Sequence, residues 1–206
     1  AHTSSVLAAY LYGLDTVEQC VNDPLINKMM RQVIFGEIIP SMEGDTAELT
    51  QYANDVLERF ANPYIKHLIL SITLNSVSKF KTRVLPSLTG YIAKKGKPPA
   101  ALSFSLAALI AFYQGVNPAG REMTGSRNGA AYTIQDDEEV LRRFSALYDG
   151  TEGDGERARK ISRAVLGSVD WWGEDLRAYP GLEDAVSAGL AAIWSSGIKS
   201  VIEGLF

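Results

Sequence analysis

Cysteine and histidine are scarce in this sequence. Among 206 residues there are one cysteine, Cys20, and two histidines, His2 and His67. A single cysteine cannot form a disulfide within the chain, and a domain of this size buries enough surface to fold without one. Three such residues, far apart in the sequence, also fall short of the ligand set of a structural zinc site. The scarcity therefore predicts a metal-free protein of a reducing compartment, the cytoplasm.

Excess positive charge and long apolar runs are also missing. Acidic residues outnumber basic ones, 24 to 20, and the resulting formal net charge of −4 argues against a nucleic-acid binder. The longest apolar run, around 106–112, is far shorter than the ~18 residues of a membrane span. The first residues also lack the basic segment of a signal peptide. We expect neither a nucleic acid nor a membrane as partner.

The common nucleotide and nucleophile motifs are absent as well. No Gly-x-Gly-x-x-Gly turn marks a dinucleotide-binding fold, and no Gly-x-Ser-x-Gly turn marks a hydrolase. Gly115 and Gly120 have the spacing that opens a phosphate loop, but Arg121 and Glu122 follow where Lys and Ser or Thr are required. The acidic segment 149–156 lacks the alternating oxygen ligands of a calcium loop. The sequence thus predicts no nucleotide site and no metal site within this chain.

Helical periodicity is present over most of the length. Asp23-Pro24, and Asp45 or Thr46, are residues that begin helices, and Pro40 and Asn62-Pro63 are residues that end them. A surface loop is expected at 114–135, with a short extended piece near 131–134, and no alternating runs indicate a sheet. The predicted fold class is therefore all-α, a bundle-like multi-helix domain. The expected helices cover residues 25–39, 46–60, 64–80, 82–93, 100–113, 136–148, 157–171 and 182–205.

The start of the chain is unusual for a complete protein. It has no initiating methionine, and helical spacing begins at once with Val6, Leu7, Tyr10, Leu11 and Leu14. Natural domains usually have a looser lead-in. We therefore interpret residues 1–206 as one domain of a longer protein.

The predicted helix 64–80 carries a row of polar residues among apolar ones. His67, Ser71, Asn75 and Lys79 recur every four positions, and such positions drift by only about 40° on a helix of about 3.6 residues per turn. The four side chains are therefore predicted to share one face. A polar row on a buried helix faces a wet cavity, whereas the same spacing also describes the solvent face of an ordinary amphipathic helix. Spacing alone favours the second interpretation.

Under the first interpretation, Lys79 is the most informative member of the row. A lysine beside buried surface can bind an anion or hydroxyl groups at close range. Lys66, Lys81 and Arg83 would add positive charge nearby.

Five stretches carry a family resemblance: HTSSVLAAYLYGLDTV, EIIP, RFANPYIKHLILSITLNSVSKFKTRVLP, LAALIAFYQG and IQDDEEVLRRF. Through them the chain resembles the C-terminal half of the mannitol dehydrogenase family, the long-chain NAD-dependent polyol and sugar-acid dehydrogenases. The resemblance implies a substrate domain of the 6-phosphogluconate-dehydrogenase C-terminal type over residues 1–206. It also implies that NAD is bound mainly by an N-terminal Rossmann-type domain outside this chain.

The resemblance assigns roles to several residues. The family's catalytic signature runs Lys, Asn, His, and His2 fits the final position, whose imidazole hydrogen-bonds the substrate. Lys79 matches a lysine that contacts the substrate, with Asn75 on the same predicted face. Where mannitol-type members place an arginine, this chain has Ser71. This departure points to the sugar-acid branch, which interconverts D-altronate and D-tagaturonate with NAD.

The sugar-acid branch needs a cation for the substrate carboxylate, and the candidates are Lys79, Lys81 and Arg83. The nearest alternative is a family member that acts on fructuronate and mannonate, or on a plain polyol. A different class is a non-enzymatic helical interaction module, which would show a large exposed apolar patch. Because the first two signature residues and the NAD domain lie outside the chain, residues 1–206 alone are expected to be inactive.

Overall fold

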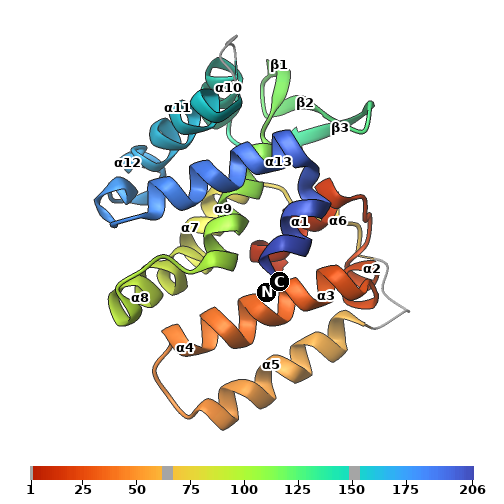
Figure 1. The fold of residues 1–206 in the computed structure, drawn as a ribbon. Coiled ribbons are helices and arrows are strands. Elements are labelled where there is room, and N and C mark those ends of the chain that lie inside the picture. Colours follow the sequence, from red (N-terminus) through yellow and green to blue (C-terminus); the bar gives the residue numbers. More distant parts are fainter. Residues whose placement is uncertain (1, 62–66, 149–153) are drawn as a thin grey trace.

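The computed structural model describes residues 2–61, 67–148 and 154–206. Helices dominate, as the sequence predicts, and the described residues also form one three-stranded antiparallel sheet (Figure 1). The helices before the sheet are α1 (His2–Tyr12), α2 (Val17–Asn22), α3 (Pro24–Arg31), the π-helix η1 (Gln32–Ile38), α4 (Ile39–Ser41), α5 (Thr46–Phe60), α6 (Ile69–Ile72), α7 (Ser76–Arg83), α8 (Leu85–Lys95) and α9 (Ala100–Phe112). The sheet and later helices are β1 (Gly115–Ala119), β2 (Glu122–Arg127), β3 (Ala130–Gln135), α10 (Glu138–Leu147), α11 (Asp154–Leu166), α12 (Val169–Trp172), the 3₁₀-helix η2 (Leu176–Ala178) and α13 (Leu182–Leu205).

Helix α9 forms the centre of the domain. Every residue from Ala101 to Phe112 is buried, so this helix is apolar all round rather than amphipathic, as expected of an element surrounded by others. It contacts α1, α11, α13 and η1. Figure 1 shows α13 running across the middle of the molecule, with the sheet at the end opposite α4 and α5.

One long rod, made of α3, η1 and α4, begins as predicted. Asp23 Oδ1 accepts hydrogen bonds from Leu25 N at 3.0 Å and from Ile26 N at 2.9 Å. Pro40 lies within the last turn instead of ending the helix, which corrects the sequence prediction. The turns before it are of the wider π type, which gives room to a proline ring that would crowd the preceding carbonyl of a regular α-helix.

The rod also carries Glu37, whose carboxylate is buried at the centre of the domain. Glu37 is 2% exposed, and its carboxylate oxygens accept hydrogen bonds from Ala101 N at 2.8 Å and from Leu102 N at 2.7 Å. These N–H groups are at the N-terminus of α9, where a helix has unpaired donors. Glu37 therefore caps α9 from a distant part of the sequence.

The single helix predicted over 64–80 is not formed, and residues 64–66 lie outside the described part of the chain. Helix α6 ends at Ile72, and α7 begins only after Asn75, whose backbone is left-handed (φ 53°, ψ 48°). The Thr73 and Ser76 hydroxyls donate to the carbonyls of Leu70 and Thr73, respectively, and such local bonds compete with a continuous helix. The polar row from His67 to Lys79 therefore does not share one helical face.

The segment 115–135 was predicted as a surface loop and instead forms the sheet; only the extended piece near 131–134, now in β3, is confirmed. The strands are ordered β1-β2-β3, with Gly125 paired to Tyr132 in the antiparallel register. A side chain at position 125 would place its Cβ 2.4 Å from the Tyr132 ring. Gly125 is thus required by the packing of the two strands.

The turn between β2 and β3 left a signal in the sequence. Asn128 and Gly129 both have positive φ angles, 52° and 81°. An Asn-Gly pair with both φ angles positive is the signature of a two-residue β-hairpin turn. The hairpin was therefore available to sequence reasoning, although its strands carry little hydrophobic alternation.

The last helices follow the predicted positions, with one break. The helix expected over 157–171 is divided into α11 and α12. Helix α13 is confirmed and is kinked at Gly197 (φ 78°, ψ 149°). It has 24 residues and contains an 18-residue window with a mean hydropathy of 1.3, so it is long and apolar enough to cross a membrane, but a core helix of a soluble protein passes the same test. Its contacts with α9 and α11 indicate a helix of the packed domain.

Candidate functional site

A small polar cavity lies where α1, α6 and α7 meet. Its volume is about 190 Å³. Four of the six predicted site residues line it: His2, Ser71, Lys79 and Arg83. The remaining lining residues are Thr3, Val6, Ile72 and Ser76. Residues from three elements therefore form one candidate site, which we call the polar cavity.

Lys79 is half-buried on the side of α7 that faces this cavity. Its Nζ donates a hydrogen bond to the carbonyl oxygen of Ile72 at 3.0 Å, which holds the long side chain back across the break between α6 and α7. Burial lowers the pKa of Lys79, and the positive charge of Arg83 lowers it further, whereas the charge of Asp136 raises it. An ammonium with one bond to the protein keeps further donors for a ligand.

His2 stands at the start of α1 and is partly buried. Its ring stacks on Phe60, with ring centroids 3.7 Å apart. Burial is the main reason why its pKa falls to about 4, and the nearby charges of His67 and Arg83 act in the same direction. Nε2 is buried and has no hydrogen-bond partner in the described part of the chain. His2 is therefore a neutral imidazole with one polar atom still to be satisfied, as expected of a group that hydrogen-bonds a ligand.

Arg83 lies at the other end of α7 from Asn75 and is exposed. Among the residues that the structure describes, no carboxylate forms an ion pair with its guanidinium. Its planar, always charged group is well suited to bind a carboxylate through two parallel hydrogen bonds. Arg83 lines both the polar cavity and a second, apolar one.

Two predicted site residues do not line the polar cavity. The Oδ1 atom of Asn75 accepts a hydrogen bond from Arg121 Nη2 at 2.9 Å, so its side chain is used within the fold. Lys81 lies beside Gly173 after α12: a Cβ built on this glycine would be 3.6 Å from Lys81 Nζ. Asn75 lies at the break before α7, whereas Lys81 follows Lys79 by two residues on α7 and therefore points to another side of the helix, about 200° around its axis.

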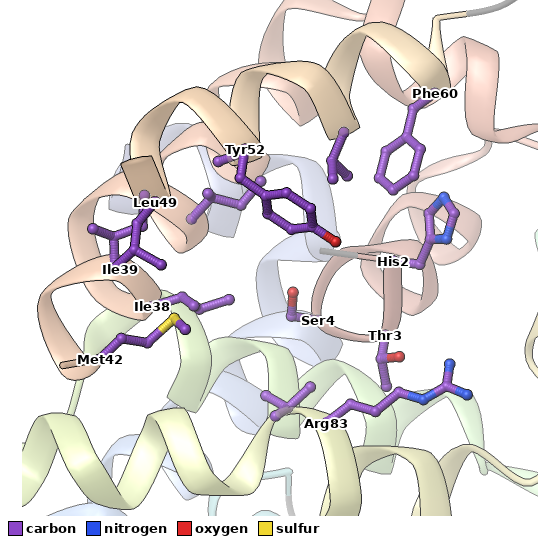
Figure 2. A pocket seen from close by; sticks show the side chains of 14 residues that line it. His2, Thr3, Ser4, Ile38, Ile39, Met42, Leu49, Tyr52, Phe60 and Arg83 are labelled. Atoms are coloured by element: carbon purple, nitrogen blue, oxygen red, sulfur yellow. The ribbon is translucent and has the colours of Figure 1, made fainter. Parts of the chain in front are cut away.

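The second cavity is apolar and lies between the start of α1 and helices η1, α4 and α5; its volume is about 340 Å³. Figure 2 shows His2 facing Phe60 at one end, Met42 with Ile38 and Ile39 at the other, and Arg83 along one side. His2, Thr3 and Arg83 line both cavities, which therefore adjoin. Tyr52 and Met42 are 66% and 46% exposed, which is high for large apolar side chains.

Sequence reasoning missed several lining residues. Phe60 and Ser76 both lie within the long motif RFANPYIKHLILSITLNSVSKFKTRVLP, but their spacing from His2 gave no signal that they contribute to the same region. Thr3 directly follows His2 in the sequence, and this position next to a predicted site residue was a signal that Thr3 lies in the same region. A cavity whose lining residues are far apart in the sequence can be recognised only from the tertiary structure.

The described residues do not fit a dinucleotide. Their one sheet is antiparallel, and it offers no strand, glycine-rich turn and helix of the kind that cradles a pyrophosphate. In the described ranges, no three His, Cys, Asp or Glu side chains are grouped so that they could hold a metal ion. The polar cavity itself presents an imidazole, an ammonium, a guanidinium and hydroxyl groups, which can bind hydroxyl groups and anions.

Several curated relatives match almost the whole chain. It is 42% identical over 205 residues to the altronate oxidoreductase of Pectobacterium atrosepticum, covering 99% of this chain and 41% of that protein. It is 42% identical over 203 residues to the altronate oxidoreductase of Yersinia pestis and 40% identical over 205 residues to that of Escherichia coli O139:H28, covering 40% of each. The chain thus spans about two fifths of the length of these relatives.

Solved structures show the same fold at lower identity. The ternary complex of Pseudomonas fluorescens mannitol 2-dehydrogenase with NAD and D-mannitol matches with a TM-score of 0.82 and 21% identity, over 99% of this chain and 38% of that one. A substrate-free D-sorbitol dehydrogenase matches with a TM-score of 0.67 and 17% identity, over 98% of this chain and 38% of that one. Residues 1–194 match the family described as the mannitol dehydrogenase C-terminal domain, which confirms the predicted resemblance. The chain therefore belongs to the mannitol dehydrogenase family, of whose C-terminal domain it is a member.

Proposed function

We propose that this chain is the substrate-binding half of an NAD-dependent oxidoreductase that interconverts D-altronate and D-tagaturonate. Relatives named altronate oxidoreductase, 40 to 42% identical over nearly the whole chain, support this substrate pair. The short share of their length that the chain spans supports a longer protein. In that protein, an N-terminal Rossmann-type domain binds NAD, which exchanges a hydride with the substrate carbon.

The composition of the polar cavity is the observation that carries this proposal. A hexonate presents hydroxyl groups and one carboxylate, and the cavity presents a neutral imidazole, an ammonium and a guanidinium from His2, Lys79 and Arg83. His2 orients a substrate hydroxyl through its unsatisfied Nε2, and Lys79 donates to a second substrate oxygen. Of the three cations considered for the carboxylate, Lys81 lies elsewhere, and of the other two only Arg83 has the planar guanidinium that binds a carboxylate through two parallel hydrogen bonds. Arg83 is therefore the proposed carboxylate partner.

Ser71 supports a substrate other than a plain polyol. The hydroxyl of Ser71 donates to the Leu68 carbonyl oxygen at 2.7 Å, so the side chain stays close to its own helix. A long cation at this position would compete with Arg83 for the same ligand group. The small residue leaves Arg83 and Lys79 as the cations of the polar cavity.

The apolar cavity supports a partner within the same protein. A sugar acid has no apolar surface to bury in a cavity lined by Ile38, Leu49 and Met42. An adjoining protein domain does have such a surface. We assign this region to contact with the N-terminal domain and place the protein in the cytoplasm. The isolated domain is then inactive, because the hydride carrier is held elsewhere.

The test is consumption of NADH by the full-length protein, with D-tagaturonate, D-fructuronate and D-fructose offered in parallel. Preference for D-tagaturonate supports the proposal. Preference for D-fructuronate or D-fructose would keep the family and overturn the substrate. No turnover of any of the three would overturn the proposed function itself.

A further inference from the structure

Helix α7, which carries Lys79, begins without a capping side chain of its own. It follows the left-handed residue Asn75, whose side chain does not accept a bond from the first turn. The first N–H groups of a helix require partners, and an uncapped start is prone to fray. What holds the start of α7 therefore also determines where Lys79 points.

A buried pair of side chains, Asp136 and Tyr113, faces this helix start. Asp136 is 1% exposed and accepts a hydrogen bond from the hydroxyl of Tyr113, which is fully buried at the end of α9. Asp137 N donates to Asp136 Oδ1 at 2.8 Å. The backbone N–H of Val77, in the first turn of α7, lowers the pKa of Asp136, against burial, which raises it. A carboxylate at this place complements the positive end of the helix.

Neighbouring bonds fix the same junction. Asn75 N donates to the carbonyl oxygen of Gln135 at 3.0 Å, which ties the start of α7 to the end of β3. Arg121 bridges the junction, since one of its nitrogens bonds Asn75 Oδ1 at 2.9 Å and the other lies 2.5 Å from Asp137. The Lys79 backbone is one turn further on, where its N donates to the Asn75 carbonyl at 3.0 Å.

We propose that Asp136, held by Tyr113, is a positioning residue for Lys79: the buried carboxylate fixes the start of α7, and the helix fixes the direction in which the ammonium enters the polar cavity. This inference rests on the proposed function of that cavity. A second effect supports it, because the negative charge of Asp136 raises the pKa of Lys79 against burial and Arg83. Besides Asp136 on the sheet side, the charged or titratable groups near Lys79 within the described ranges are Arg83 on α7 and His2 on α1.

The experiment compares Asp136→Asn and Tyr113→Phe with Glu37→Gln in the full-length protein. Glu37 is a matched control, since it is also a buried carboxylate at a helix start, but it caps α9. The readouts are KM and kcat for D-tagaturonate and the pH dependence of trace acetylation at Lys79, measured by mass spectrometry. Acetylation reports the Lys79 pKa without requiring activity.

Asp136→Asn is expected to raise KM about tenfold with a smaller change in kcat, and to move the Lys79 acetylation profile to lower pH. Tyr113→Phe is expected to raise KM about threefold. Glu37→Gln is expected to lower the melting temperature and leave both readouts unchanged.

The inference is overturned if folded Asp136→Asn and Tyr113→Phe proteins keep the KM and the acetylation profile of the wild type. If Asp136→Asn does not fold, the KM of Tyr113→Phe decides. A wild-type protein that turns over no sugar acid would overturn the proposed function, whereas the acetylation profile of Asp136→Asn would still test the positioning of Lys79.

Discussion

The rings of His2 and Phe60 stack nearly parallel, with their planes 15° apart and their centroids separated by 3.7 Å. This contact joins the start of α1 to the end of α5 and places the imidazole at the border of the two cavities. Burial there holds the pKa of His2 at about 4, so the side chain is neutral near pH 7. A neutral imidazole can orient a substrate hydroxyl without repelling the cations beside it.

Replacing Phe60 by Leu tests the effect of the stack. The smaller side chain exposes the His2 ring to water, so the pKa of His2 is expected to rise from about 4 toward its ordinary value of 6.5. Histidine NMR titration of the 206-residue chain, carried out in parallel on the unsubstituted chain, measures this shift. An unchanged His2 pKa would show that the stack does not control it.

The same group predicts how stability depends on pH. The unfolded chain binds a proton at His2 below its ordinary pKa of 6.5, whereas the folded chain does so only below about 4. The free energy of unfolding should therefore fall as the pH drops from 6.5 to 4, by about 1 kcal/mol once solvent screening of this partly exposed group is allowed for. Urea unfolding of the wild type and His2→Gln across this range gives the difference. A wild type that loses no more stability than His2→Gln would contradict the assignment.

Gly125 provides a test of the sheet. Gly125→Ala would place a Cβ atom 2.4 Å from the Tyr132 ring, and the hydroxyl of Tyr132 is anchored to the Phe112 carbonyl at 2.7 Å. The expected cost is about 1–3 kcal/mol, measured by urea unfolding. Gly155→Ala is the control, because nothing lies within 4 Å of its Cβ position in α11. Equal effects of the two substitutions would argue against the β2–β3 packing.

Local sequence signals predicted most helices but not the junctions that build the site. Asp23 and Asp45 both cap helices as their types predict, because capping depends on neighbouring residues only. The left-handed Asn75 could not be predicted, since it depends on bonds to Gln135 and Arg121 from the sheet. Consequently, the inclusion of Lys79 and Arg83 in one cavity with His2 follows from tertiary packing. Lys81 lies outside it for a local reason, because residues two positions apart do not share a helix face.

Arg83 is expected to govern discrimination between a sugar acid and a neutral sugar. Arg83→Ala in the full-length protein should lower kcat/KM for D-tagaturonate by about 30-fold or more, because a charged two-bond contact to the carboxylate is lost. The value for D-fructose, which has no carboxylate, should change by less than about threefold. Parallel initial-rate measurements with NADH provide the ratio. Equal losses for both substrates would exclude a carboxylate-specific role.

We expect the polar cavity to bind the substrate through Lys79. The most direct test compares Lys79→Ala with Lys81→Ala in the full-length protein, using kcat/KM for D-tagaturonate with NADH. Lys81 is a matched control, two residues away on the same helix but beside Gly173 and outside the polar cavity. We expect a loss of about 30- to 100-fold for Lys79→Ala and less than about threefold for Lys81→Ala. Wild-type activity in Lys79→Ala, or an equal loss in both variants, would contradict it.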